Sequence, residues 1–232
     1  MTADKSGEGS RGKVIPQLFK SKNSPYRRFG KRLFDLTLAV PGYLVLSSVM
    51  GVIALLVRLK LGCPVLFRQE RPGLHGMPFT IYKFRTMTDA INPDGKLLPD
   101  AERLTRLGRF LRSTSLDELP ELWNVLKGDM SIVGPRPLLM QYLERYTPVQ
   151  ARRHEVKPGI TGWAQVNGRN NTPFSKRFAM DVWYVDNCSF QLDLKIIILT
   201  VIKVLRQEDV RSDLDQCYYE VDDCGLSNDR NK

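Results

Sequence analysis

The sequence LTLAVPGYLVLSSVMGVIALLV, residues 36–57, decides how the rest of the chain is interpreted. It runs for 22 residues without Asp, Glu, Lys or Arg, which is long enough for a helix to reach across a bilayer. It begins too deep in the chain for a cleavable signal peptide, and no clear small-residue cleavage site follows it. The sequence therefore predicts a membrane-associated helix within residues 26–60.

Basic residues flank this apolar segment on both sides, and the positive-inside tendency draws both of its ends toward the cytoplasm. A straight span cannot satisfy both ends. Pro41 bends a helix, and the hydroxyls of Ser47 and Ser48 can satisfy freed carbonyls. Three shapes stay open: a re-entrant hairpin that dips into one leaflet, a spanning helix, and a buried helix of a soluble core. The flanking basic residues are Arg27, Arg28, Lys31, Arg32, Arg58, Lys60 and Arg68.

Charge is distributed unevenly along a chain whose formal net charge is +10. Residues 1–25 are rich in Lys, Ser, Gly and Asn, which is typical of a basic flexible arm. Residues 207–232 form an acidic tail, and residues 61–206 are expected to form one compact domain. The four cysteines form no Cys-x-x-Cys pair, so a zinc site or a disulfide framework is not expected, and a reducing location fits better. His75 and His154 are expected at the surface.

The domain of residues 61–206 shows both strand and helix patterns, which predicts an α+β fold with amphipathic interfacial helices. Residues 103–112 place arginines every third position on a helix that either lies on an anionic membrane surface or is a solvated face. The expected strands are Pro64–Arg68 and Pro78–Met87, with a turn at Asn92–Gly95. The expected helices are Arg103–Arg112, Leu138–Val156 and Asp193–Leu205.

Two adjacent carboxylates, Asp117 and Glu118, stand out in this basic chain. Ser115 with Glu118 three residues later reads as a capping box, and Pro120 fits a first helical turn if Asp117 is the cap. A helix N-terminus also keeps an Asp ionised, as metal binding or attack on phosphorus requires. Cap and chemistry are therefore compatible. Lys83, Arg112 and Arg136 are candidate partners for a pyrophosphate.

Five motifs, in the correct order, resemble the bacterial sugar transferase family. They are KRLFD at 31–35, YKFRTM at 82–87, RSTSLDEL at 112–119, NVLKGDMSIVGPRP at 124–137 and KPGITGWAQVNGRN at 157–170. The resemblance covers Arg28 to Arg206 and is closest to the small monotopic phosphoglycosyl transferases, which start membrane-bound glycan assembly. One position departs from it, because small members carry a Ser-Pro pair where this chain has Ser47-Ser48.

The resemblance implies a reaction on the cytoplasmic face of the bacterial inner membrane. A sugar 1-phosphate passes from a UDP-sugar to undecaprenyl phosphate, and UMP is released. Asp117 attacks the sugar-linked phosphorus to give a covalent phosphosugar-enzyme, and Glu118 orients it or assists proton handling. A Mg²⁺ ion beside Asp117 neutralises the diphosphate. An N-acetylated amino sugar is slightly favoured, with galactose or glucose as the alternative.

The same resemblance assigns further site residues. Lys83 and Asp181 match charged positions of the family's active site, although each could instead be an ordinary surface charge. Arg112 and the run Pro135, Arg136 and Pro137 match segments that hold phosphate and nucleotide, and residues 157–170 match an active-site loop.

Two other classes of protein fit the sequence less well. A nucleic-acid-binding protein fits the pI of about 9.6 but leaves the apolar segment unexplained, and no recognition motif appears. A membrane-tethered scaffold leaves the paired carboxylates without a role. The oligomeric state is not predicted.

Overall fold

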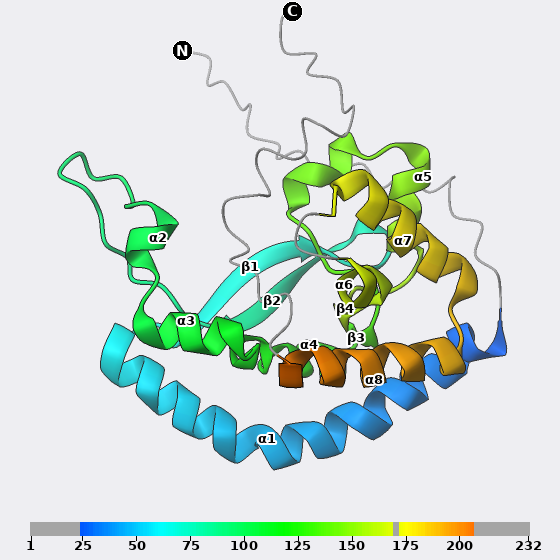
Figure 1. The fold of residues 1–232 in the computed structure, drawn as a ribbon, viewed down its shortest axis with the longest axis horizontal. Coiled ribbons are helices and arrows are strands. Elements are labelled where there is room, and N and C mark those ends of the chain that lie inside the picture. The colour runs from blue at the N-terminus through cyan, green and yellow to red at the C-terminus, as the bar shows by residue number, and fades with distance from the viewer. Residues whose placement is uncertain (1–23, 169–171, 207–232) are drawn as a thin grey trace, which may run out of the picture.

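A single long helix lies beneath an α+β body in the computed structural model (Figure 1), which describes residues 24–168 and 172–206. This helix, α1, spans Lys31–Leu61, and a π-helical turn, η1 (Tyr26–Gly30), precedes it. It is bowed: both ends rise toward the body, and its convex side faces away (Figure 1). The predicted apolar helix is therefore present, and the basic arm before Ser24 and the acidic tail lie outside the described residues.

Helix α1 continues through Pro41 without a break. The hydroxyls of Ser47 and Ser48 bond the carbonyl oxygens of Leu44 and Val45, at 2.6 and 3.4 Å. Of the shapes that the sequence left open, the structure therefore contains one continuous curved helix without a sharp bend at Pro41. The re-entrant path itself stays a prediction.

The two sides of α1 differ in exposure. Its concave side contributes Ala39 to a core cluster with Ile81 and Val125, and Ile53 and Val57 to another with Phe84. The other side leaves large apolar residues in the open, with Leu44 68% and Val45 72% exposed. Within residues 24–168 and 172–206, Tyr26–Leu61 is the one helical run long and apolar enough to cross a membrane.

Buried polar contacts fix the start of α1 to the body. Asp35 accepts hydrogen bonds from the Ser131 hydroxyl at 2.8 Å and the Ile132 amide at 3.0 Å. The Lys31 ammonium lies 2.7 Å from the Asp193 carboxylate, and both side chains are buried. Buried charges of this kind persist only when they are paired. These contacts explain two of the charged residues in the KRLFD motif.

An antiparallel hairpin follows α1. Strand β1 (Leu66–Pro72) pairs with β2 (Pro78–Phe84), and the short η2 (Leu74–Gly76) joins them. Both predicted strands are present, although β1 begins two residues later and continues further than expected, and β2 ends at Phe84 instead of Met87. Two residues of β2, Ile81 and Phe84, are buried in the clusters to which α1 contributes.

The basic helix predicted over residues 103–112 is two helices, α2 (Asp100–Arg103) and α3 (Arg106–Ser113). Leu104 forms a β-bridge with Met87 instead of continuing the helix. The Thr105 hydroxyl then accepts the Gly108 amide at 2.9 Å and caps α3. The predicted turn is present, since the Gly95 amide bonds the Asn92 carbonyl.

A second, parallel pair of strands lies under the later helices. Strand β3 (Ser131–Val133) pairs with β4 (Gly159–Thr161), Ser131 opposite Gly159. The backbones here approach so closely that a Cβ atom at Gly159 would lie 2.0 Å from the Gly134 nitrogen. A glycine at this position is therefore a packing requirement.

The remaining segments are helical. The long helix predicted over 138–156 is three short elements: η4 (Met140–Arg145), α5 (Pro148–Ala151) and η5 (Arg152–Glu155). The chain restarts at Thr147, which forms a capping box with Gln150, and Pro148 cannot continue a preceding helix. The chain then continues through α6 (Trp163–Asn167), α7 (Phe174–Asn187) and α8 (Phe190–Arg206).

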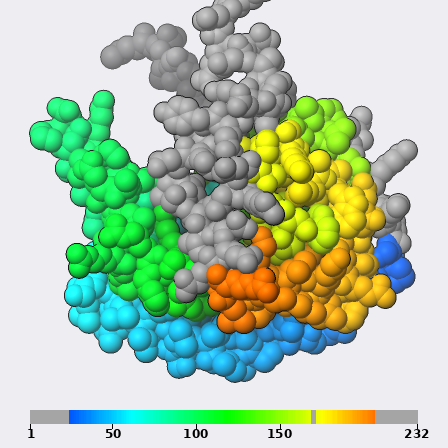
Figure 2. Space-filling model, in the orientation of Figure 1, coloured from blue at the N-terminus to red at the C-terminus, as the bar shows by residue number. Residues whose placement is uncertain are grey.

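Helix α8 confirms the last predicted helix and lies directly above α1 on the face shown in Figure 2. Apolar residues at helical spacing stay exposed along it, and Leu205 is 78% exposed. A surface helix with so many open apolar residues is typical of a contact with lipid or with a partner. The exposed residues are Phe190, Leu194, Ile198, Val201, Ile202, Val204 and Leu205.

Candidate active site

The paired carboxylates lie on η3 (Leu116–Glu118), a single 3₁₀ turn between α3 and α4 (Glu121–Lys127). Ser115 adopts a left-handed conformation with φ 55°, and its side chain caps nothing. The capping box predicted for Ser115 and Glu118 is therefore wrong, because a cap residue needs an extended backbone to turn its oxygen toward the helix. Asp117 is not a cap either, since Pro120 holds that position before α4.

Two cations hold Glu118. Its Oε1 atom lies 2.6 Å from the Lys83 ammonium and 2.7 Å from an Arg136 guanidinium nitrogen. Burial alone would raise the pKa of Glu118, but Arg136 and Lys83 outweigh burial and lower it to about 2. Glu118 is therefore ionised at any pH near neutrality, and it brings together three residues that the sequence had placed in one site.

Asp117 differs sharply from its neighbour. It is 8% exposed, and no donor among residues 24–168 and 172–206 makes a hydrogen bond to its carboxylate. Burial and then the charge of Glu118 raise its pKa to about 6, against the opposing effect of Lys83, Arg112 and Arg136. At pH 7 most of the carboxylate is ionised yet poorly solvated, which suits a nucleophile.

A third carboxylate, Glu121, belongs to the same cluster and was not predicted. It is buried in the first turn of α4, 3.3 Å from the Lys83 ammonium. Burial and then the Glu118 charge raise its pKa to about 7. Its position three residues after Glu118 was the available signal, because residues at that spacing meet on one helical face.

Arg112 contributes an unfilled donor. Its Nε atom donates to the Thr86 hydroxyl at 3.1 Å. Its Nη1 atom is buried and has no hydrogen-bond partner in the part of the chain that the structure describes. Buried donors without a partner are uncommon, and a guanidinium favours phosphate oxygens. This supports the predicted phosphate role of Arg112.

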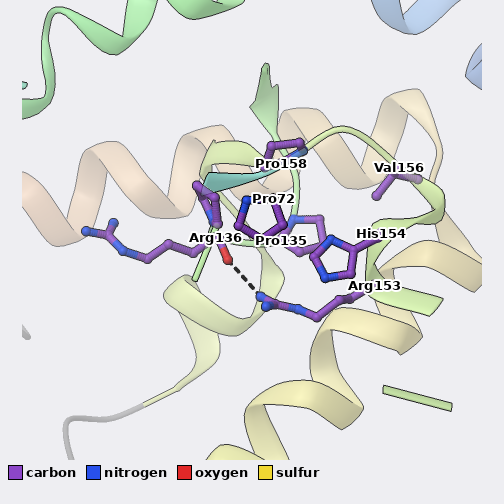
Figure 3. Close-up of a pocket in the computed structure, with 8 residues that line it drawn as sticks. Pro72, Pro135, Arg136, Arg153, His154, Val156 and Pro158 are labelled. Atoms are coloured by element: carbon purple, nitrogen blue, oxygen red, sulfur yellow. Dashed lines mark hydrogen bonds between the residues drawn. The ribbon is translucent and has the colours of Figure 1, made fainter. Parts of the chain in front are cut away.

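Asp181 does not join the carboxylate cluster. It lies in α7 and is buried against Arg153, with 2.8 Å between the carboxylate and the guanidinium. Arg153 in turn donates to the backbone carbonyl of Arg136 at 2.7 Å, as Figure 3 shows. The predicted supporting role of Asp181 therefore has an indirect geometry, through Arg153 and the Arg136 backbone.

His154 contradicts its predicted surface position. It is buried in a small pocket together with Pro72, Pro135 and Pro158 (Figure 3). Burial and then the charge of Arg153 lower its pKa to about 3, so the ring is neutral. The prediction failed because η5 turns inward behind the 135–137 run. His75 is exposed, as expected.

The carboxylates of the site suit Mg²⁺ only when a substrate supplies further ligands. No group of three His, Cys, Asp or Glu side chains within residues 24–168 and 172–206 is arranged to hold a metal ion. Asp117 has no ion-pair partner in the part of the chain that the structure describes, whereas Glu118 pairs with Lys83 and Arg136. Mg²⁺ is commonly bound by one or two carboxylates plus substrate phosphates and water, so the residues present fit that mode.

An apolar bowed helix beneath a cluster of buried carboxylates and cations is compatible with a membrane-associated transferase. The comparison with known proteins agrees: the sequence profile described as "Bacterial sugar transferase" matches residues 26–207. The chain belongs to the bacterial sugar transferase family.

Individual relatives add detail. The chain is 63% identical over 181 residues to "Uncharacterized sugar transferase EpsL" of Bacillus subtilis, covering 78% of this chain and 90% of that protein. It is 44% identical over 202 residues to "UDP-glucose:undecaprenyl-phosphate glucose-1-phosphate transferase" of Escherichia coli, covering 82% of this chain and 43% of that protein. It is 40% identical over 199 residues to "Undecaprenyl-phosphate galactose phosphotransferase" of Salmonella typhimurium, covering 78% and 41%. The chain thus spans less than half the length of these two relatives with a named activity.

Proposed function

We propose that this protein transfers a sugar 1-phosphate from a UDP-sugar to undecaprenyl phosphate and releases UMP. The observation that carries the proposal is Asp117: a buried carboxylate, largely ionised at neutral pH and free of hydrogen-bond donors among the described residues, beside three cationic side chains. Basic groups around an unengaged carboxylate suit an anionic substrate that the carboxylate attacks. The names of the Escherichia coli and Salmonella relatives describe this class of transfer.

The proposed reaction has two balanced steps. An oxygen of Asp117 attacks the sugar-linked phosphorus, the bond from that phosphorus to the UMP oxygen breaks, and UMP leaves with the electron pair. An oxygen of the lipid phosphate then attacks the same phosphorus, and the bond to Asp117 breaks. This restores the carboxylate and gives a lipid diphosphate sugar.

The neighbouring side chains have separate parts in this scheme. Arg112 offers its open Nη1 donor to a phosphate oxygen. Glu118 keeps Lys83 and Arg136 in place rather than moving a proton, because its pKa of about 2 leaves it ionised throughout. Preorganised cations of this kind stabilise the charge that develops during phosphoryl transfer.

We also propose Mg²⁺ as the cofactor, held by Asp117 and the donor diphosphate. When bound, the ion would neutralise phosphate charge. The chain's own contribution is then to leave the Asp117 carboxylate without an ion-pair partner among the described residues. It also holds the cationic side chains of Lys83, Arg112 and Arg136 near that carboxylate.

The protein is proposed to lie on the cytoplasmic face of the bacterial inner membrane. Both ends of α1 rise toward the body (Figure 1), which supports a path that enters and leaves one leaflet. The exposed apolar residues of α1 and α8 would face the hydrocarbon, where burying apolar surface is favourable. The prenyl chain of the acceptor would then approach from the same side as α1.

The donor sugar has two candidates. The family resemblance of the sequence slightly favours an N-acetylated amino sugar. The printed names of the Escherichia coli and Salmonella relatives specify glucose and galactose, which supports UDP-glucose or UDP-galactose as the alternative. A panel containing all of these donors separates the two.

The test uses purified full-length protein in phospholipid nanodiscs with Mg²⁺, undecaprenyl phosphate and each UDP-sugar. Wild type should release UMP with at least one donor, and Asp117→Asn should abolish release. Asp94→Asn, an exposed aspartate in the 92–95 turn, is the matched control and should be active. Without acceptor, a donor labelled in the sugar should leave label on wild type and none on Asp117→Asn. No UMP with any donor, or an active Asp117→Asn, would overturn the proposal.

A further inference from the structure

Arg153 in η5 makes an unusual number of buried contacts for a residue outside the carboxylate cluster. Its Nε and Nη2 atoms donate to one oxygen of Asp181 at 3.1 and 2.8 Å. Its Nη1 atom donates to the Tyr146 hydroxyl at 2.9 Å, and Nη2 also donates to the Arg136 carbonyl at 2.7 Å. Figure 3 shows this last bond beside the small pocket.

The guanidinium of Arg153 is held from every side. The residue is 3% exposed, and its guanidinium carbon lies 5.7 Å from the Tyr146 ring centroid and 5.4 Å from that of Phe178. Asp181 supplies the compensating charge that a buried cation requires. Arg153 is therefore a rigid donor aimed at one backbone oxygen.

That oxygen belongs to the turn that carries Arg136. Pro135 and Pro137 have no amide hydrogen to donate, and two carbonyls of the turn accept hydrogen bonds from outside it. The Pro135 carbonyl accepts the Gly159 amide at 3.0 Å, and the Arg136 carbonyl accepts Arg153. The Arg136 guanidinium then reaches Glu118 at 2.7 Å.

We propose that Arg153 is a positioning residue for the transfer reaction. Backed by Asp181, it fixes the backbone of Arg136 and so aims the Arg136 guanidinium at Glu118 and at the donor phosphates. This rests on the proposed function, because it gives Arg136 a substrate. It also gives Asp181 a definite part: Asp181 acts by holding Arg153.

Lysine should not replace Arg153, because an ammonium cannot bond Asp181, Tyr146 and the Arg136 carbonyl in the planar arrangement of a guanidinium. Arg152 provides a matched control. It is adjacent, and it pairs with Glu155 at 3.0 Å and Asp186 at 2.5 Å. Neither of these ion pairs involves residues 134–137.

The experiment is a double-mutant cycle in nanodiscs, with Arg153→Lys, Arg136→Lys and the double variant. Arg153→Lys should lower kcat/KM for the UDP-sugar by about 10- to 100-fold, the cost of misplacing a binding group by about 1 Å. In the Arg136→Lys background it should change kcat/KM by less than about twofold, because coupled residues are not additive. Arg152→Lys should stay within about twofold of wild type.

Two further measurements keep the outcome decisive. UDP binding is measured for all four proteins of the cycle. The coupling between Arg153 and Arg136 can then be obtained from binding even where turnover is slow. Thermal unfolding shows whether Arg153→Lys is folded. A wild-type level of kcat/KM in Arg153→Lys, or equal losses in both Arg136 backgrounds, would overturn the positioning role. A wild type that releases no UMP would instead refute the proposed function.

Discussion

Glu118 and Glu121 are one helical turn apart and share the Lys83 ammonium, yet their substitution by Gln should have opposite effects on stability. Glu118 is the partner of two cations, whereas Glu121 is a buried carboxylate that competes with Glu118 for one of them. Gln keeps the size and the acceptor oxygen in both cases. The comparison therefore isolates charge.

The magnitude follows from the pKa values. Lys83 and Arg136 overcome burial and lower the pKa of Glu118 from 4.5 to about 2, and each pKa unit is worth about 1.4 kcal/mol. The ionised Glu118 thus contributes about 3 kcal/mol to the free energy of unfolding, fully present above pH 4.5 and lost as the pH falls toward 2. Glu118→Gln should remove about 3 kcal/mol at pH 7.

Glu121 has the opposite sign. Burial and the Glu118 charge raise its pKa from 4.5 to about 7, so the folded state binds a proton that the unfolded state releases. Stability therefore falls as the pH rises from 4.5 to 7, by about 3 kcal/mol in total. Glu121→Gln removes this loss. It should be neutral near pH 4.5 and stabilising by up to about 3 kcal/mol at pH 8, reduced by the weaker attraction of Gln for Lys83.

The assay is denaturant unfolding of each protein in the same detergent micelles at pH 5, 7 and 8, without divalent cations, so that only protons titrate. Glu70→Gln, an exposed glutamate of β1, controls for general loss of negative charge and should change little. The reasoning is refuted if the stability of Glu121→Gln relative to wild type does not rise between pH 5 and pH 8. It is equally refuted if Glu118→Gln is as stable as wild type at pH 7.

Two other substitutions test how the site is held. Arg32→Met should cost about 1–3 kcal/mol of stability and slow UMP release, since Arg32 donates to the Val125 and Leu126 carbonyls at the end of α4. Its unfolding and its rate of UMP release are compared with those of Arg28→Met. Arg28 is exposed, so this control should resemble wild type. Gly134→Ala should cost about 3 kcal/mol or more, because its Cβ would lie 2.4 Å from a backbone oxygen. Gly51→Ala, whose Cβ would meet nothing within 4 Å, should be neutral or slightly stabilising in the same unfolding measurement, because alanine favours a helix interior. A Gly134→Ala protein of wild-type stability would contradict the close packing.

The sequence predicted the chemistry of the site better than its local structure. Lys83, Arg136 and Glu118 were expected in one place and lie in one place. The cap at Ser115 was not found, because the pattern does not reveal that the backbone turns left-handed there. Residue patterns report what a segment prefers, and tertiary packing decides between preferences that are close in energy.

Local sequence patterns did not predict the contacts between segments that are distant in the chain. Arg153 and Asp181 are 28 residues apart, and each alone looks like an ordinary helical surface charge. The break at Leu104 has the same origin, since its bridge to Met87 forms only once the chain after β2 has folded back. The pair Asp117 and Glu118 was predictable because its motif is local. The shell that positions it was not, because it depends on the assembled fold.

Helix α1 belongs to the active site as much as to the membrane. Arg32 holds the C-terminal carbonyls of α4, the helix whose first turn carries Glu121 and which follows the Asp117 turn directly. Asp35 holds β3, whose end leads into the turn of Arg136. The segment that carries the carboxylates and the turn that carries Arg136 are thus both fixed to the first two turns of α1. In the proposed mechanism, the depth at which α1 lies in a bilayer therefore sets the height of Asp117 above it, and so the distance that a lipid phosphate would rise to reach Asp117.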